Sequence, residues 1–473
     1  MSGLDAVVVG AGPNGLAAAV TLAREGASVL VIERDREIGG GTRSAELTRP
    51  GFVHDVCSAI HPLVLASPFF RNLPLAEHGL EMVHPEIPLA HPLGGDRAAV
   101  LARDVGETAA GLAGDGRAYE RLYRPLVDHW AEVADELLRR VRFPHHPLLM
   151  ARFGLTGIRS AEGLATSRFE GDEARALLGG LAAHSMLSLD KSPTGGFGMF
   201  LGILAHAVGW PAASGGSSAI ASALGSYFEG LGGTIETGRE VGSIDDLPAA
   251  RAYLLDVTPR QLVAIAGSRL PGRYRESLGR FRYGPGVFKI DWALDGPVPW
   301  SAEACRKAGT VHVGGTLDEL IASEKAVTSG RVPERPYVLV AQQSLFDPSR
   351  APTGGHTLWA YCHVPAGSGV DMTEAIEAQI ERFAPGFQAL ILDRSVRSAA
   401  SMESHNPNHI GGDINGGIQD LRGHLFRPVV SLDPYSTPSR DVYICSSSTP
   451  PGGGVHGMCG HLAARSALRR SLS

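Results

Sequence analysis

The chain has 473 residues, 44% of them hydrophobic and 19% charged, with a formal net charge of −6 at pH 7. This length exceeds what one compact core supports, and it predicts two or three domains of ordinary globular composition. The negative net charge and the lack of a basic run argue against nucleic acid as a partner.

The cysteines and the apolar runs indicate a protein of the reducing cytoplasm. The five cysteines share no CxxC spacing, so we expect neither a disulfide framework nor a metal site. The first apolar run begins at Leu4, which leaves no room for a signal peptide. No run reaches the roughly eighteen apolar residues of a membrane span. A peripheral membrane contact stays open.

The N-terminal stretch has the pattern of a strand, a glycine-rich turn and a helix. Residues 4–9 are β-branched and too few for a helix, which is typical of a buried parallel strand. Gly10 permits the tight turn after the strand, and Gly12 lets a pyrophosphate approach the backbone. Gly15 lets the next helix pack against the sheet.

The helix that starts at Pro13 and Asn14 would offer free N–H groups to phosphates. Glu33 ends the second apolar run at a spacing suited to ribose hydroxyls, and Arg34 follows it. A carboxylate there would repel a 2′-phosphate. The stretch therefore predicts dinucleotide binding, and the alternative is a glycine-rich turn that binds nothing.

A second glycine cluster decides between the dinucleotides. Gly40, Gly41, Thr42 and Arg43 follow Glu33 closely and are not needed for a plain nicotinamide cofactor. They suit a cofactor whose pyrophosphate is held from two sides. The cluster therefore favours FAD.

Residues 39–43, together with 50–52, Asp55 and 58–62, resemble the start of phytoene desaturase-related FAD-dependent oxidoreductases. The branch is that of pyridine nucleotide-disulfide oxidoreductase domain-containing protein 2. The resemblance implies an α/β fold with a Rossmann-type FAD-binding domain of the glutathione-reductase-like superfamily. It also implies a discontinuous substrate domain of mixed sheet plus helices.

Helices dominate the chain between residues 116 and 210. Apolar positions at helical spacing predict one helix over 116–142, and three more are expected over 151–210. The last of these, 197–210, is apolar nearly all round. It is a buried core helix, the wall of a lipophilic substrate tunnel or a membrane-surface helix, although its lack of Lys and Arg weakens the third interpretation.

After residue 210 the chain is expected to return to the cofactor domain. Ser217 is placed to cap a helix over 218–231, and 234–244 has the pattern of a strand pair or a bent strand. The resemblance implies that backbone near Val241 meets the adenine. One short strand follows at 252–255.

The second half predicts a mixed or antiparallel sheet that roofs the substrate cavity. A helical stretch at 259–280 precedes strands, and further helices lie between those strands. The expected strands are 287–294, 310–314, 337–342 and 357–364, and the expected helices are 316–329 and 371–384.

The closing segment repeats the order of strand, glycines and helix. A strand at 441–445 precedes a serine-rich loop, and Gly453, Gly454 and Val455 lead into a helix that reaches residue 470. It resembles the C-terminal FAD motif of the family, with Ser447 in a loop where many relatives carry Asp. A helix N-terminus there would stabilise negative charge on the reduced flavin.

The expected domain boundaries follow from these segments. The FAD-binding domain comprises residues 1–95, 211–260 and 431–473, with a helical lid or substrate region at 96–210 and a substrate domain with a sheet at 261–430.

Oxidation of a C–C bond needs a group that accepts a proton beside the flavin. His61, His456 and Asp55 are the candidates, and His61 is also a candidate for cofactor contact. The alternative for His61 is a loop residue hydrogen-bonded to backbone. His184 and His206 lie in apolar helical surroundings, where satisfied core histidines are more common.

The leading hypothesis is an FAD-dependent oxidoreductase that transfers hydride to flavin N5 from a lipophilic, isoprenoid-like or polyene molecule. The electron acceptor stays open between oxygen, a quinone and another protein. The alternatives are a flavin-dependent isomerase or hydratase of a double bond, and a carrier of prenyl groups that resembles the GDP-dissociation inhibitors. Amine oxidation ranks lower, because it usually needs an aromatic cage. The oligomeric state stays open.

Overall fold

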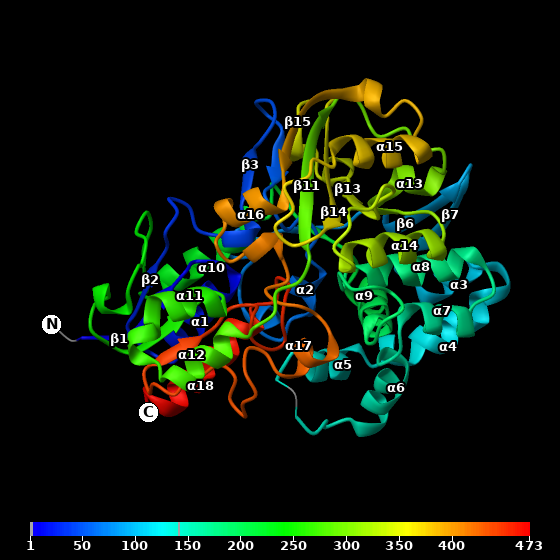
Figure 1. Ribbon diagram of the computed structural model, residues 1–473. Helices are drawn as coiled ribbons and strands as arrows, with labels where there is room; N and C mark the ends of the chain where they lie inside the picture. Colours follow the sequence, from blue (N-terminus) through cyan, green and yellow to red (C-terminus); the bar gives the residue numbers. More distant parts are fainter. Residues whose placement is uncertain (1–2, 141) are drawn as a thin grey trace.

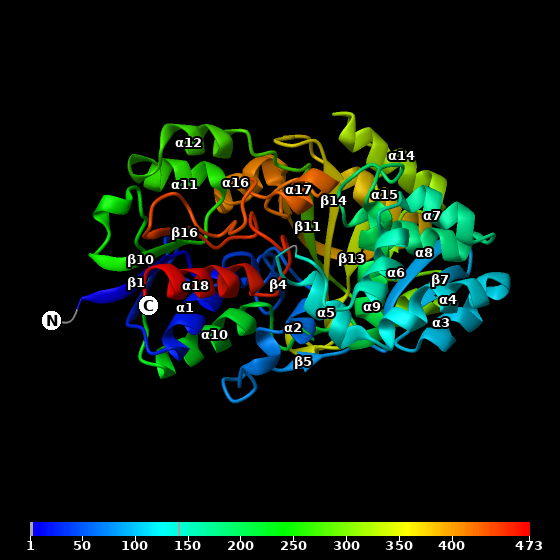
Figure 2. The same ribbon diagram turned by 90° about the horizontal axis from the view of Figure 1, so that it is seen from below.

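The protein folds into two lobes that share one cavity. The computed structural model describes residues 3–140 and 142–473. One lobe has a five-stranded sheet and the other a seven-stranded sheet (Figure 1). Helices α3 (Val105–Gly111), α4 (Gly116–Val127) and α7 (Ala161–Arg168) lie at the end of the molecule opposite α18 (Met458–Arg470), as Figure 2 shows.

The first sheet is parallel throughout, in the order β16-β10-β1-β2-β9. Its strands are β1 (Leu4–Val9), β2 (Val29–Ile32), β9 (Thr234–Glu236), β10 (Ala250–Leu255) and β16 (Val442–Ile444). The strands predicted at both ends of the chain are thereby confirmed as members of one sheet. Because the sheet is parallel, the carboxyl ends of all five strands lie at one edge, where such folds bind ligands.

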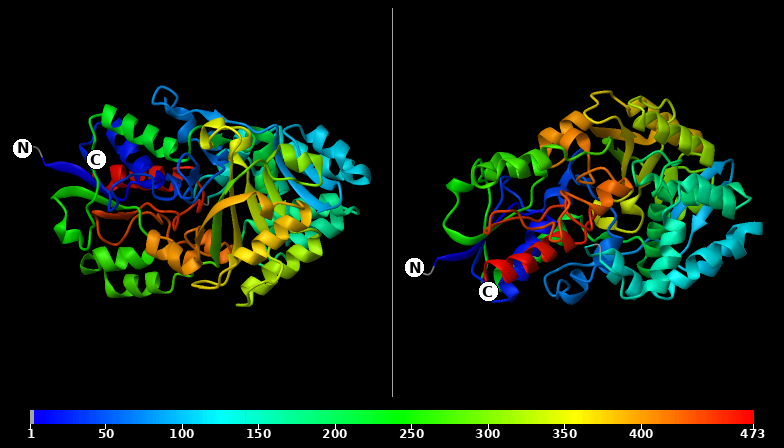
Figure 3. Two further views of the ribbon diagram at one scale, coloured as in Figure 1. Left: turned by 90° about the horizontal axis from the view of Figure 1, so that it is seen from above. Right: turned by 60° about the horizontal axis from the view of Figure 1, so that its bottom comes forward.

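Helices cover both faces of this sheet, as a parallel sheet requires. The helices on one face are α1 (Pro13–Arg24), α10 (Ser218–Gly230) and α18, and those on the other are α11 (Pro259–Ala266) and α12 (Gly272–Gly279). The views in Figure 3 keep α1 and α18 beside each other at the same end. The single helical stretch expected over 259–280 is thus two helices.

The second sheet is mixed, in the order β15-β11-β14-β13-β12-β6-β7, and only β6 and β12 pair in parallel. Its strands are β6 (Ile87–Gly94), β7 (Arg97–Leu101), β11 (Gly286–Leu294), β12 (Ala308–Val313), β13 (Val338–Ala341), β14 (His356–Val364) and β15 (Ile391–Arg397). Four of these strands were expected. The domain boundary expected at residue 95 falls inside the β6–β7 hairpin.

One face of the second sheet carries an apolar core. Phe288, Ile290, Val311, Val340 and Ala360 face this core, which helices complete. The helices on this face are α13 (Glu303–Lys307) and α15 (Thr373–Phe383), whereas α14 (Leu317–Thr328) packs on the opposite face, where Leu320 joins Leu339 and Tyr361. The opposite face of the sheet is turned toward the cavity.

The helical region differs from the prediction in where its helices begin and end. The helix expected over 116–142 is two helices, α4 and α5 (Trp130–Leu137), since His129 leaves helical geometry at the start of α5. Four helices rather than three follow: α6 (Pro147–Gly157), α7, α8 (Asp172–Ala183) and α9 (Thr194–Val208). Hydrophobic periodicity continues across the break and therefore could not reveal it.

Helix α9 decides between the three interpretations of the apolar stretch 197–210. No residue of this stretch is exposed, so the membrane-surface interpretation is wrong. Met199 and Ile203 are fully buried in a helical core, whereas Leu201 and Trp210 line the cavity. The stretch is therefore both a core helix and a cavity wall. Within the described residues, no helix is both long and apolar enough to span a bilayer.

The remaining short elements connect the lobes. They are α2 (Pro62–Ala66), α16 (Ala399–His405), α17 (Leu421–Leu425), the pair β3 (Ser44–Glu46) and β4 (Val53–Asp55), and the pair β5 (Met82–Val83) and β8 (Ala212–Ala213). The strand pair expected over 234–244 is only the short strand β9, because the chain turns at Gly238 and continues without a second strand.

A buried ion-pair network joins the two lobes. Arg350, fully buried, contacts Asp55 at 3.1 Å and Asp347 at 2.8 Å. The Ser217 N–H donates to Asp55 at 2.7 Å, and the Ser217 hydroxyl donates to the same carboxylate, so it does not cap α10 as predicted. Burial alone would raise the pKa of Asp55, but Arg350 and Ser217 outweigh it and hold this pKa below its usual value.

Replacing Arg350 by Met should lower the free energy of unfolding by about 3–5 kcal/mol, because two buried carboxylates lose their partner. Chemical denaturation at neutral pH measures the loss. Arg97→Met is the matched control, since Arg97 is a largely exposed partner of Glu173 and its loss should cost far less than the loss of Arg350. Equal effects of the two substitutions would contradict the network's role.

Candidate functional site

A cavity of about 620 Å³ lies between the two lobes. One end is formed by the carboxyl edge of the parallel sheet, by the first glycine turn and by the glycine cluster at residues 40–43. The other end is formed by α9 and by the cavity-facing side of the second sheet. A single cavity therefore joins the predicted nucleotide site to the predicted substrate site.

Glu33 lies at the end of β2, 9% exposed, and lines the cavity. Its carboxylate accepts the Ala11 N–H at 2.7 Å and the Asp35 N–H at 3.0 Å. These bonds fix the side chain while each oxygen keeps a free acceptor position. The arrangement suits the binding of ribose hydroxyls.

The glycines of the first turn are required by close packing. A Cβ on Gly15 would lie 1.9 Å from the Gly10 carbonyl oxygen, so helix α1 can approach β1 only through glycine. A Cβ on Gly40 would lie 3.2 Å from Gly12 Cα, which brings the two glycine segments into contact. Gly41 has no atom within 4 Å of its Cβ position and faces open space. This narrow backbone cradle fits the pyrophosphate of FAD.

Asp256 is the main residue of this cradle that the sequence reasoning missed. It follows β10 at the carboxyl edge of the sheet, and its carboxylate accepts the Gly15 N–H at 2.9 Å. Burial, with Glu33 nearby, raises the pKa of Asp256 to about 7. The sequence could have indicated Asp256 as a site residue, because ligands bind at the carboxyl ends of parallel strands and the strand before it was predicted.

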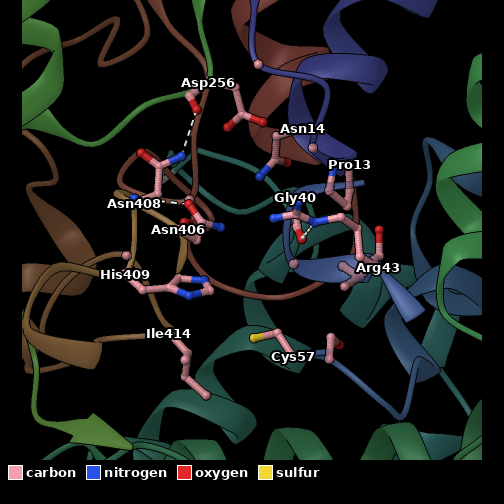
Figure 4. Close-up of a pocket in the computed structure, with 18 of the residues that line it drawn as sticks. Pro13, Asn14, Gly40, Arg43, Cys57, Asp256, Asn406, Asn408, His409 and Ile414 are labelled. Atoms are coloured by element: carbon pink, nitrogen blue, oxygen red, sulfur yellow. Dashed lines mark hydrogen bonds between the residues drawn. The ribbon is translucent and has the colours of Figure 1, made fainter. Parts of the chain in front are cut away.

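Residues from two sides face each other across the nucleotide end of the cavity (Figure 4). Pro13, Asn14 and Arg43 lie on one side, and the amide Asn408 lies on the other. Asn408 donates from its side chain to the Asp256 carbonyl at 3.0 Å and accepts the Thr258 N–H at 3.1 Å. This amide therefore fixes the chain just after β10.

Most of the predicted cofactor residues line the cavity. They are Gly10, Gly12, Pro13, Asn14, Glu33, Arg34, Gly40, Gly41, Thr42, Arg43, His61, Val241, Ser447, Gly454 and Val455. Gly15 and Gly453 are not among the lining residues: Gly15 packs against Gly10 of the first turn, and Gly453 packs against Asn415. Contact of these residues with the cofactor stays a prediction.

His456 is held inside the C-terminal turn rather than in the cavity. It is 1% exposed, its Nε2 donates to the Gly452 carbonyl at 3.1 Å, and its Nδ1 accepts the Met458 N–H at 3.0 Å. Burial lowers the pKa of His456 to about 4. Since both ring nitrogens are engaged in shaping the turn, the structure does not favour His456 as a proton acceptor.

Asp55 and His61 come from neighbouring segments but differ in access. Asp55 is fully buried in the network with Arg350 and does not line the cavity. His61 lines the cavity, its Nδ1 lies 3.4 Å from the Ser58 hydroxyl, and its Nε2 has no partner within the described residues. Burial lowers the pKa of His61 to about 4, so the ring is neutral at pH 7. Of the three predicted bases, only His61 is at the cavity.

The substrate end combines the stretch 197–210, which was predicted as a possible tunnel wall, with strand residues that the sequence left unassigned. Trp359 and Tyr361 project from β14 with their rings 5.2 Å apart, edge to face. The rest of this wall consists of His184, Leu201, Trp210, Thr310 and Leu339. The residues converge from α8, α9, β12, β13 and β14, and sequence spacing could not bring them together. The described residues hold no cluster of three or more side chains suited to a metal ion.

The raised pKa of Asp256 predicts that FAD binding weakens as the pH rises. Below pH 7 the carboxyl is mostly neutral, and above it the carboxylate repels the pyrophosphate. We expect FAD affinity, measured by fluorescence titration, to be several-fold lower at pH 8 than at pH 6. Asp256→Asn should abolish this dependence, and a wild-type affinity independent of pH would contradict it.

Comparison with known proteins agrees with the geometry. A model of the NAD(P)-binding Rossmann-like domain matches residues 8–72. Pyridine nucleotide-disulfide oxidoreductase domain-containing protein 2 of Rattus norvegicus is 26% identical, over 98% of this chain and 93% of that protein. The neurosporene-forming phytoene desaturase of Rhodobacter capsulatus is also 26% identical, over 96% of this chain and 92% of that enzyme.

The fold agrees as well. A solved structure of a putrescine oxidase variant superimposes with a TM-score of 0.62 at 17% identity and covers 98% of both chains. The α/β architecture with a Rossmann-type domain and a second, mixed sheet is thereby confirmed. The chain is a homologue of the phytoene desaturase-related oxidoreductases over nearly its whole length, as the motifs at both of its ends predict.

Proposed function

We propose that the protein is an FAD-dependent oxidoreductase that dehydrogenates a C–C bond of a small, largely apolar molecule. One observation carries the proposal: the glycine cradle and the aromatic wall around Trp359 belong to a single cavity. A dinucleotide held in the cradle would therefore extend toward the aromatic wall. The relatives named above support the reaction class, and the lining of the substrate end supports the substrate class.

When bound, FAD supplies the acceptor for the hydride that leaves one carbon of the substrate. The chain must then take up the proton that leaves the neighbouring carbon. His61 is placed for this role because it is neutral at pH 7 and its Nε2 is unpaired within the described residues. Trp359, Tyr361 and Leu201 would hold the substrate and exclude water from it.

Amine oxidation ranks below this proposal, although Trp359 and Tyr361 form an aromatic pair that the sequence analysis did not foresee and that could hold an ammonium group by a cation–π contact. The other kind of partner for a buried ammonium group is a carboxylate. The acidic side chains that line the cavity are Glu33, Asp35, Glu240 and Asp256, and all lie at its nucleotide end. A prenyl carrier without FAD would not need the close glycine packing at Gly15 and Gly40.

The test uses three probes that share one ten-carbon skeleton with a six-membered ring: limonene, dihydrocarvone and carvylamine. Each is mixed anaerobically with the FAD-loaded protein while the flavin absorbance is followed. We expect bleaching by the hydrocarbon or the ketone, with a product two hydrogens poorer by mass spectrometry. Bleaching by the amine alone, or by none of the three, would contradict the proposal.

His61→Gln should slow flavin reduction by at least about tenfold while the FAD content stays unchanged, because the proton acceptor is lost and the side-chain volume is kept. The wild-type rate should be flat between pH 6 and pH 8 and fall as the pH approaches about 4, where His61 becomes protonated. His129→Gln, at a largely exposed position, is the control. Equal rates for both variants would exclude His61 as the base.

We also propose a peripheral membrane contact, through the segment 137–161 rather than through α9. This segment holds five arginines and no acidic residue, in a chain of net charge −6, and Asp135 and Glu136 just before it pair with two of them, Arg139 and Arg142. Phe143, Leu148 and Leu155 are 84%, 87% and 76% exposed. Exposed apolar side chains among arginines match the chemistry of an anionic lipid surface. Helix α6 of this segment packs on α9, which carries the cavity residue Leu201.

Sedimentation with vesicles tests this contact. We expect the protein to pellet with vesicles that contain phosphatidylserine and to stay in solution with phosphatidylcholine alone, since the attraction is partly electrostatic. The triple variant Phe143→Ser, Leu148→Ser and Leu155→Ser should lose binding. No binding to anionic vesicles, or unchanged binding of the triple variant, would refute the contact.

A further inference from the structure

The cavity-facing side of the second sheet is polar where a hydrocarbon tunnel would be aliphatic. Strand pairing places Thr310, Ala341, Trp359 and Asp291 in one row across β12, β13, β14 and β11. The row two residues further along contains His312, Leu339, Tyr361 and Lys289. Because side chains alternate along a strand, both rows lie on the same face, and the opposite face is the apolar core.

Two pairs of charged residues on this face neutralise each other, and Arg397, which pairs with Lys289 across β15 and β11, does not line the cavity. Lys289 is hydrogen-bonded to Asp291, and the ring of His363 contacts the Glu324 carboxylate at 2.8 Å. Neither Lys289 nor Asp291 lines the cavity. The part of this face that borders the cavity is therefore polar but uncharged.

Seven cavity-lining side chains carry buried polar atoms that lack a partner within the described residues, and three of them, besides His61, belong to the substrate end. Trp210 Nε1, Trp359 Nε1 and the Thr310 hydroxyl are buried and make no hydrogen bond within the described residues. A buried polar group without a partner is rare in native proteins and destabilising. Three such groups on the wall of one cavity indicate that a ligand completes them.

The kind of ligand follows from the donors. An indole N–H only donates, so Trp210 and Trp359 require an acceptor, and the Thr310 hydroxyl is able to donate to the same kind of atom. Trp210 belongs to the same wall, since its ring lies 5.8 Å from that of His312, two residues after Thr310. The arginines that line the cavity, Arg34, Arg43 and Arg239, are at the nucleotide end. A buried carboxylate would need a cationic partner, and the lining arginines are not at this end. The acceptor that these donors bind is therefore a neutral oxygen.

Resting on the proposed function, we infer that the substrate carries a neutral oxygen acceptor, of the carbonyl type, which Trp210, Trp359 and Thr310 recognise at the end of the cavity away from the nucleotide. The substrate is then an oxygenated molecule with an apolar body, not a pure hydrocarbon such as a polyene. The indoles provide both the apolar contact and the hydrogen bond, as is common for buried tryptophan.

Isothermal titration of the FAD-loaded protein with carvone and with limonene tests this inference. The two probes share one ring skeleton and differ by the carbonyl group. We expect carvone to bind at least about tenfold more tightly, since a buried hydrogen bond contributes roughly that factor. Equal affinities, tighter binding of limonene, or no binding of either probe would overturn the inference.

Two variants locate the recognition. Trp359→Phe and Thr310→Val remove a donor while keeping most of the side-chain volume, and each should weaken carvone binding more than limonene binding, so that the preference for carvone falls several-fold while the FAD content stays unchanged. Trp130→Phe, which removes an indole N–H outside the cavity, should leave the preference intact. A preference that survives in both cavity variants would refute the assignment.

Measurements of probe binding and of flavin reduction distinguish a failure of this inference from a failure of the proposed function. A protein that prefers carvone but whose flavin no probe reduces would retain the oxygen site and lose the redox proposal. A protein whose flavin is reduced by limonene, with no preference for the ketone, would retain the redox proposal and lose the oxygen site.

Discussion

The close contact between α1 and α18 is the constraint on which the rest of the structure depends. A Cβ on Gly460 would lie 1.8 Å from the Asn14 carbonyl oxygen, so the first and last long helices of the cofactor lobe meet where only glycine fits. This contact brings residues that are more than four hundred positions apart to one side of the parallel sheet. Gly12 and Gly454 consequently line the same cavity.

Charge is distributed so that the cavity has two distinct ends. Carboxylates and arginines line the nucleotide end, where ribose hydroxyls and a pyrophosphate need them. At the opposite end, charged side chains are withdrawn behind the wall and pair with each other, as Lys289 does with Asp291. The network of Arg350 and Asp55 holds the lobes together beside this wall. The polar nucleotide site and the uncharged substrate site are thus consequences of one folded arrangement.

Local patterns predicted the cofactor lobe well. Gly10, Gly12, Gly15 and Glu33 lie in one short stretch whose spacing reflects the turn, the helix and the sheet edge that it forms. The C-terminal motif was found in the same way. The strands of the second sheet were also visible, because β11 and β14 are long and rich in residues that favour strands.

Long-range contacts were hidden for physical reasons. Ser217 has the pattern of a helix cap, yet a buried carboxylate from another segment takes its hydroxyl. His456 stands beside a cofactor motif, yet the turn that it stabilises uses both of its ring nitrogens. Trp210, Thr310 and Trp359 all belong to the lobe of the second sheet, and they border one cavity only once that lobe has folded, which no spacing along the chain encodes. Only the structure shows which buried groups lack a hydrogen-bond partner and which residues the strand pairing places side by side.

The stoichiometry of flavin binding tests the central claim most directly. The purified protein is incubated with excess FAD and desalted, and the ratio of bound flavin to chain is measured from absorbance after release. If both ends of the chain form a single dinucleotide site, the ratio will be one, and Gly460→Val will lower it strongly while Gly154→Val, at an uncrowded helical position, will not. A wild-type protein that retains no flavin, or a Gly460→Val variant that retains as much as wild type, would contradict the account.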